Sequence, residues 1–432
     1  MIACLAQRLQ IIFLALVTVC FPLNLAAQDD KPLTLEQALQ AADAAHPDLQ
    51  IAQAEREMAL ADQTAAGARR DLSVSLEGRL QQAQSSLPDA KFSADNSVRL
   101  LARKNLYDFG RTSSAESAAS AVVDARDLQL IDVRDLRRLD IMARYFDVLI
   151  TDMQYISDNE YMTVWYFTFD RARERYEQKL ASKVEVAEAE ARFQDFLVKR
   201  NETQRRQRLS RAMLADAMNQ PGQLPSELAD PALASNDRPL PEYEELLKLI
   251  EQNPKFKANQ QLLEASRQRL EAVRADKNPT LDLELEANEY ANRKLSGRDE
   301  YRAGVVLSWP LYQGNRVSSQ LAREQAQFHK LQAENEKYKR SLMSATLAVW
   351  IEVEQLQKTA RNAAKVQADY RDLSLERARA LYEVELRTTL GETMASTADA
   401  KLRQRSVEYK LALAFAKLEA LLGQPLPAPV KK

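Results

Sequence analysis

The sequence predicts a mainly α-helical protein with a small β part, built twice in tandem. Two stretches contain almost no helix breaker, since residues 111–220 have neither glycine nor proline and residues 315–422 have only Gly391. Segments of alternating apolar and polar residues precede each stretch. Because proline and glycine are the residues that most often end helices, the long stretches indicate very long helices and the alternating segments indicate strands.

Four landmarks recur in the same order in both halves, at offsets of 204–209 residues. The paired landmarks are 46–49 with 253–256, 72–80 with 281–289, 106–111 with 311–316, and 214–225 with 418–427. One such echo is expected by chance, but four in order are not. The chain is therefore predicted to be an internal repeat of about half its mature length.

Residues 1–27 are predicted to be a signal peptide. Arg8 precedes an apolar run at 11–19, which is too short to span a membrane as a helix, and small residues follow. Cys4 and Cys20 both lie in this segment, so the mature chain is expected to lack disulfides, zinc and thiol chemistry. Its net charge becomes 59 − 62 = −3, and no basic cluster indicates nucleic-acid binding.

The first repeat is expected over 28–220 and the second over 240–424, with a linker at 221–239 and a tail at 425–432. Each repeat opens with short helices, and Thr34 with Gln37 has the spacing of a capping box. Strands are expected at about 72–83, 97–107, 280–290 and 301–311. Long helices are expected at about 111–178, 183–218, 315–384 and 389–422.

The strands have the length and alternation of tilted transmembrane strands. Four strands cannot close a barrel, and open strand edges are not tolerated in lipid, so three chains with 12 strands are inferred. The charges expected to face the lumen are Arg99, Arg103, Asp282, Glu284 and Glu286. The aromatic residues expected at the membrane interfaces are Tyr107, Tyr290, Trp309 and Tyr312.

The helices also have a coiled-coil pattern, with apolar residues spaced by three and four. In the first long helix this seam consists of Leu139, Met142, Phe146, Leu149, Met153 and Ile156. The helices alone are equally typical of a periplasmic coiled-coil adaptor or scaffold without a pore. That alternative stays open, but it leaves the four alternating segments unexplained.

These features together resemble the TolC-like outer-membrane efflux protein family, over essentially the whole mature chain. The likeness rests on the tandem repeat, the paired strands, the joins at 106–112 and 309–316, and the helical turns at 176–193 and 382–402. The resemblance implies a homotrimer with a 12-stranded transmembrane β-barrel on a long periplasmic α-helical barrel. It further implies a Gram-negative outer-membrane duct that serves tripartite efflux or type I secretion. A periplasmic adaptor and an inner-membrane transporter, either ABC or proton-driven, are the implied partners.

The resemblance also implies a gate at the periplasmic tip. Arg387 matches an arginine that bonds a neighbouring helix, Glu185 matches its acidic partner, and Tyr382 matches a tyrosine of the same latch. Such a pair is reversible and geometrically specific. The family's entrance aspartates correspond here to Gly391 and Met394, with Glu392 as a possible substitute charge. Lys179 and Glu385 stand where the family often has glycines.

Enzymatic function is not expected. His46 and His329 are the only histidines, and neither has a neighbouring ligand or nucleophile in the sequence. His46 precedes a proline and is better interpreted as a helix-boundary residue. No cofactor is predicted, and the sequence does not identify the cargo.

Overall fold

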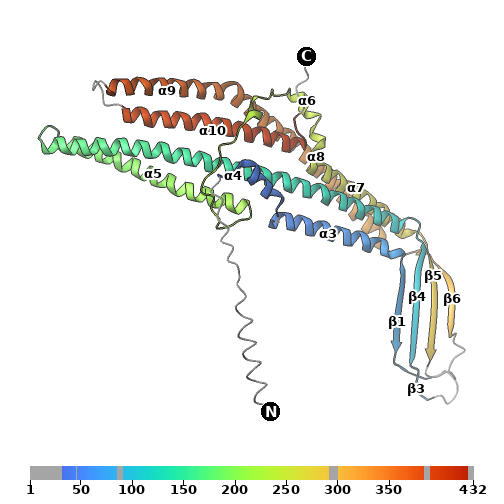
Figure 1. Cartoon of the computed structure of the whole chain (residues 1–432). Coiled ribbons are helices and arrows are strands. Elements are labelled where there is room, and N and C mark those ends of the chain that lie inside the picture. The colour runs from blue at the N-terminus through green and yellow to red at the C-terminus, as the bar shows by residue number, and fades with distance from the viewer. Residues whose placement is uncertain (1–31, 45, 85–90, 291–299, 384–389, 427–432) are drawn as a thin grey trace, which may run out of the picture.

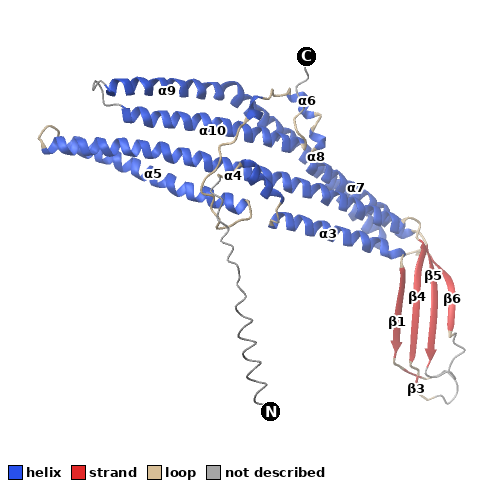
Figure 2. Cartoon of the chain, in the orientation of Figure 1, coloured by secondary structure: helices blue, strands red, loops and turns tan. Residues whose placement is uncertain are grey.

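The computed structural model describes residues 32–426 except 45, 85–90, 291–299 and 384–389. Helices form a long, slender body, and the main strands gather at one end of it (Figures 1 and 2). We call the end with strands the sheet end and the opposite end the tip. In the parts of the chain that the structure describes, no helix joins enough length to enough apolar character to cross a bilayer.

The described residues of the first repeat form two shorter and two long α-helices. They are α2 (Leu35–Gln40), α3 (Pro47–Gly67), α4 (Arg111–Glu177) and α5 (Lys183–Ala217). The predicted capping box forms at α2, with Thr34 and Gln37 bonded reciprocally. His46 is confirmed as a boundary residue, because its Nδ1 accepts from the Asp48 backbone N–H at the start of α3. α4 has 67 residues, which is about 100 Å at 1.5 Å per residue.

The second repeat contains α6 (Tyr243–Leu247), α7 (Pro254–Arg274), α8 (Arg316–Gln355), α9 (Arg361–Glu383) and α10 (Leu390–Leu422). The single helix expected at 315–384 is interrupted by a π-helical turn, Leu356–Ala360. The linker fixes this turn, because the Gln357 side chain donates to the backbone carbonyls of Asn236 and Arg238 at 3.3 and 2.7 Å. The first repeat has no such interruption in α4.

The strands form one antiparallel sheet in the order β1 (Leu72–Arg79), β4 (Ser97–Tyr107), β5 (Thr280–Tyr290), β6 (Tyr301–Ser308). Two of the expected ranges are too long. The segment 72–83 divides into β1 and β2 (Gln82–Ala83), which pairs with β3 (Ser93–Ala94). β6 ends at Ser308, close to Pro310, which has no N–H to donate to a neighbouring strand.

The apolar core lies midway along the body, where the linker crosses the helices. Tyr145 and Phe146 of α4 are buried there with Leu214 of α5 and Tyr409 of α10. The Tyr145 hydroxyl donates to the carbonyls of Leu33 and Ala229, which ties the start of the first repeat to the linker. Burial raises the pKa of Tyr145 to about 12, so the hydroxyl stays a donor at neutral pH.

The contact between α4 and α5 is apolar near the middle of the body and becomes polar toward the tip. Phe146 and Leu149 are buried as the sequence pattern predicts, but Ile156 is 55% exposed. Asp158 occupies the buried position instead and accepts from the Thr203 hydroxyl at 2.6 Å. Lys199 lies 3.0 Å from the same carboxylate. The pair of helices is therefore joined here by satisfied polar groups, which the apolar spacing of the sequence does not reveal.

Candidate channel sheet and tip gate

The strand register gives the sheet one apolar and one charged face. Leu76 of β1 faces Leu100 of β4, which faces Ala287 of β5, which faces Tyr301 of β6. The apolar face is uncovered, and Leu76 is 72% exposed on it. The other large apolar side chains exposed on this face are Leu72, Val74, Val98, Leu100, Leu285, Tyr301, Val305 and Leu307. Such a contiguous apolar surface indicates contact with a partner or a lipid phase.

The charged face brings the five predicted lumenal residues together on β4 and β5. The Nε of Arg99 lies 3.0 Å from a Glu286 carboxylate oxygen, and the Nε of Arg103 donates to Glu284 at 2.8 Å. Asp282 accepts from the Asn105 amide at 2.9 Å. Opposite charges facing each other on adjacent strands stabilise the register.

Sequence reasoning missed the two ends of this ladder. Glu77 of β1 lies 4.0 Å from Arg99, and Arg302 of β6 lies 3.9 Å from Glu286. A row of alternating charge therefore crosses all four strands. The strand alternation placed both residues on the polar face, but their pairing depends on the register between strands that are far apart in sequence.

The four predicted interfacial aromatic residues fall into two groups. Tyr107, Trp309 and Tyr312 are exposed where the strands meet the helices. Tyr290 lies at the opposite end of β5 and pairs with Ser97, in register with the charged face. Tyr301 is the aromatic residue at that end of the apolar face, and it is 81% exposed.

The predicted latch residues lie at the tip, as far as the structure describes them. Glu185 is exposed in the first turn of α5, and its backbone N–H donates to the Ser182 hydroxyl at 3.1 Å. Tyr382 is exposed near the end of α9. Arg387 lies in 384–389, outside the described residues, as does Glu385.

Glu392, the predicted entrance charge, lines a pocket with several aromatic residues. This pocket lies between the helices α4 and α5 on one side and α9 and α10 on the other. Glu392 of α10 and Arg371 of α9 line this cavity of about 400 Å³, together with Tyr161, Trp165 and Phe196. A Cβ on the adjacent Gly391 would lie 3.1 Å from Cγ2 of Val164. Space for an aspartate at this position is therefore limited, because α10 approaches α4 closely there.

The α4–α5 turn has a left-handed residue where the family often has glycine. Lys179 adopts φ 61°, and Leu180 donates from its backbone N–H to the Arg175 carbonyl at 2.7 Å. A non-glycine residue in this conformation costs about 1 kcal/mol. We expect Lys179→Gly to slow amide hydrogen exchange in the turn by about two- to fivefold, since glycine removes that cost. Lys183→Gly, at the first residue of α5 and not in a left-handed conformation, should not slow exchange in the turn, and unchanged exchange in Lys179→Gly would contradict the assigned strain.

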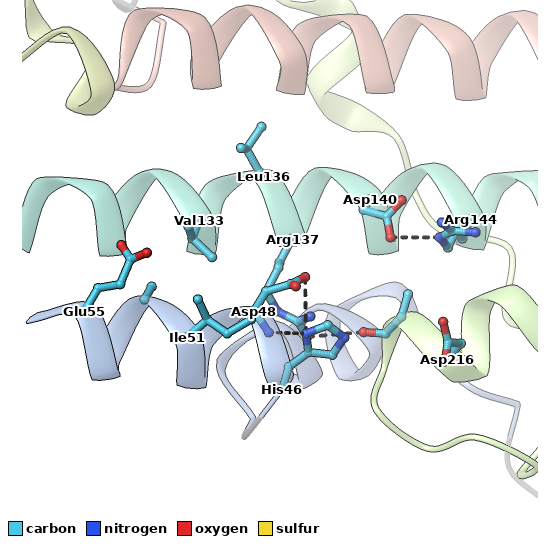
Figure 3. A pocket seen from close by; sticks show the side chains of 12 residues that line it. His46, Asp48, Ile51, Glu55, Val133, Leu136, Arg137, Asp140, Arg144 and Asp216 are labelled. Carbon is cyan, nitrogen blue, oxygen red and sulfur yellow. Dashed lines mark hydrogen bonds and ion pairs between the residues drawn. The ribbon is translucent and has the colours of Figure 1, made fainter. Parts of the chain in front are cut away.

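A second pocket of about 620 Å³ lies midway along the body between α3, α4 and α5 (Figure 3). Arg137 is the buried charged residue among those that line it, at 6% exposure. Its guanidinium donates to the carbonyls of Ala41, Ala42 and Ala217 at 3.5, 3.3 and 3.2 Å. Desolvation lowers the pKa of this group, and Asp48 and Asp140 partly offset that effect. Arg137 thus satisfies the ends of two separate helical segments.

The fold is that of outer-membrane channels. The outer membrane protein VceC of Vibrio cholerae aligns with a TM-score of 0.72 at 20% identity, over 90% of this chain and 96% of that chain. The CmeC outer membrane channel of Campylobacter jejuni gives 0.74 at 12% identity, over 90% and 85%. The MtrE outer membrane channel of Neisseria gonorrhoeae gives 0.71 at 18% identity, over 90% and 89%.

A family model described as "Outer membrane efflux protein" matches residues 246–424, which form most of the second repeat. This match covers less than half of the chain, whose second repeat is therefore similar to that family. A search of the curated proteins found no matching relative.

Proposed function

We propose that three copies of this chain form one exit duct through the outer membrane. The observation that supports this proposal is the sheet, which has one apolar and one charged face. In the described part of the chain, β1 and β6 each have a single strand neighbour, so both edges are open. Successive strands are antiparallel, so β6 of one copy can pair antiparallel with β1 of the next. Three sheets of four strands would close into 12 strands, with the apolar face toward lipid and the charged ladder toward the lumen.

The tip is the proposed docking end for a periplasmic adaptor and an inner-membrane transporter. Tyr176, Leu180 and Val184 are exposed around the α4–α5 turn, and exposed apolar side chains of this size support a protein contact. A photo-crosslinker at Leu180 in cells should capture the adaptor, whereas one at the exposed Gln325 of α8 should not. The captured transporter then identifies the cargo class, because an ABC exporter favours protein secretion and a proton-driven pump favours drugs or metals.

The proposed gate is a latch between Glu185 and Arg387, with Tyr382 beside it. The exposed positions of Glu185 and Tyr382 on helix ends near the tip support a contact that forms and breaks without disturbing the core. An arginine–carboxylate pair suits this role because its geometry is specific and it is reversible. Opening would then require only the modest energy that separates such switching states.

Planar bilayer recordings test the duct and the latch together. Purified protein should insert as trimers with low conductance, and Arg387→Ala should raise that conductance several-fold by releasing the tip. Arg173→Ala removes an exposed ion pair with Asp170 within α4 and serves as the matched control. Trimers that stay non-conducting even with Arg387→Ala would refute the proposal. Extraction from membranes without detergent would favour the periplasmic scaffold instead.

Ion selectivity should follow the charged face of the sheet. Glu284 and Glu286 balance Arg103 and Arg99 across β4 and β5. Changing both glutamates to glutamine removes the main partners of these arginines, so the lumen of each trimer would lose six negative charges. We expect the reversal potential in a KCl gradient to shift toward anion selectivity. Glu264→Gln, in α7 and outside the sheet, should leave it unchanged, and an unshifted potential in the double variant would mean that these residues do not line the pore.

A further inference from the structure

The sheet end carries cations without counter-ions on the side of the apolar face. Lys104 of β4 lies in register between Leu72 and Leu283, both residues of that face. Lys277 ends the short helical turn immediately before β5. Neither ammonium group has a hydrogen bond or an ion pair within the described residues, and both side chains are exposed.

Three carboxylates near this end of the sheet already have partners. Asp276 pairs with Arg111 at 2.7 Å, and Asp282 accepts from Asn105 on the charged face. Asp108 is buried and accepts from the Thr112 backbone N–H at 2.8 Å. Among the described residues, the two lysines are therefore left without an ion-pair partner.

Lys277 also lines a pocket of about 330 Å³ formed by the join between β6 and α8. Trp309 continues the alternation that puts Val305 and Leu307 on the apolar face, and it is 61% exposed. Leu311 and Tyr312 follow at 81% and 90% exposure. Amphipathic rings beside an ammonium group are typical of the depth at which lipid headgroups lie.

We propose that this rim binds an anionic phospholipid, with its phosphate at Lys277 and its acyl chains along Trp309 and the apolar strand residues. Lys104 extends its ammonium from the apolar face toward the same headgroup layer, as lysines at membrane interfaces do. A zwitterionic headgroup fits less well, because its own ammonium would face two uncompensated lysines. The inference rests on the proposed placement of the sheet in the membrane.

The first repeat supports this assignment with the same chemistry at the equivalent place. Arg69 and Arg70 end the helical turn that precedes β1, as Lys277 precedes β5. Tyr107 and Phe109 pack edge to face, with ring centroids 4.6 Å apart, at the join between β4 and α4. Basic residues before a strand and aromatic residues after its partner thus occur in both halves of the chain.

Lipid contact can be measured at Trp309 itself. The chain has three tryptophans, so a variant with Trp165→Phe and Trp350→Phe keeps Trp309 as its only one. This variant would be reconstituted in vesicles containing either brominated phosphatidylglycerol or brominated phosphatidylethanolamine with the same acyl chains. We expect phosphatidylglycerol to quench Trp309 at lower mole fraction, and Lys277→Gln to weaken that relative affinity by about fivefold.

Lys330→Gln is the matched control, since Lys330 is an exposed lysine of α8 beside Glu334 and away from the rim. It should leave the preference unchanged. Equal quenching by the two lipids, or a preference that survives Lys277→Gln together with Lys104→Gln, would overturn the inference. Conductance measured on the same vesicles separates the two proposals. A conducting trimer without lipid preference contradicts only the lipid site, whereas absence of both conductance and quenching contradicts the membrane placement.

Discussion

Gly423→Ala is expected to lower the free energy of unfolding by about 2–4 kcal/mol, the sum of backbone strain and steric overlap. Gly423 has φ 69°, which alanine adopts only with strain. A Cβ there would lie 2.7 Å from the Gln252 carbonyl oxygen, 2.7 Å from Cδ of Pro254 and 2.9 Å from Cα of Asn253. Two of these atoms belong to backbone at the start of α7, so they cannot move without shifting that helix.

The measurement is the midpoint of thermal unfolding of the purified protein, followed by circular dichroism. Gly222→Ala is the control, because Gly222 has φ 86° but no atom within 4 Å of its added Cβ. The Gly222→Ala variant should lose less stability than Gly423→Ala, because only the backbone strain at positive φ applies to it. Asn219, with φ 58°, occupies the equivalent position in the first repeat and shows that a side chain is tolerated where space allows. Equal effects of the two substitutions would contradict the steric account.

Arg137→Met is expected to destabilise the protein by roughly 2–4 kcal/mol, because buried carbonyls would lose a charged donor. Methionine fills much of the same volume, so the effect reports hydrogen bonding more than a cavity. The carbonyls concerned end the first short helices and α5, so local opening should appear there first, as faster amide exchange in 38–44 and 213–218. Arg134→Met, at an exposed position of α4 one turn away, should change neither exchange nor unfolding. Stability equal to that of the unmodified protein would mean that water replaces the guanidinium without cost.

The long helices and the two-faced strands were predictable because their signals are local. The absence of proline and glycine permits α4, and alternation assigns Leu76 and Arg99 to opposite faces without knowledge of the partners. Thr34 and His46 were likewise recognised from residues next to them in the chain. The fold class was therefore accessible from the sequence.

Features made by residues far apart were not accessible. Asp158 is buried in the α4–α5 seam only because Thr203, 45 residues away, satisfies it, and the apolar spacing favoured Ile156 instead. Glu77 and Arg302 join the charged ladder through strand register alone. The latch stays a prediction, because it depends on Arg387 and on contacts between helix ends that no local pattern specifies.

The π-helical turn at 356–360 determines which residues of the following helix, α9, face inward. Val353 and Ala368 are both buried, and 368 − 353 = 15 residues separate them, one more than the fourteen of two heptads. The wide turn absorbs the surplus residue. In an unbroken helix the polar Gln367 would take the inward position that Ala368 holds. The two halves of the chain have the same order of parts but are therefore not interchangeable. In α4 the buried positions follow one helical repeat along the whole helix, whereas between α8 and α9 the repeat shifts by one residue.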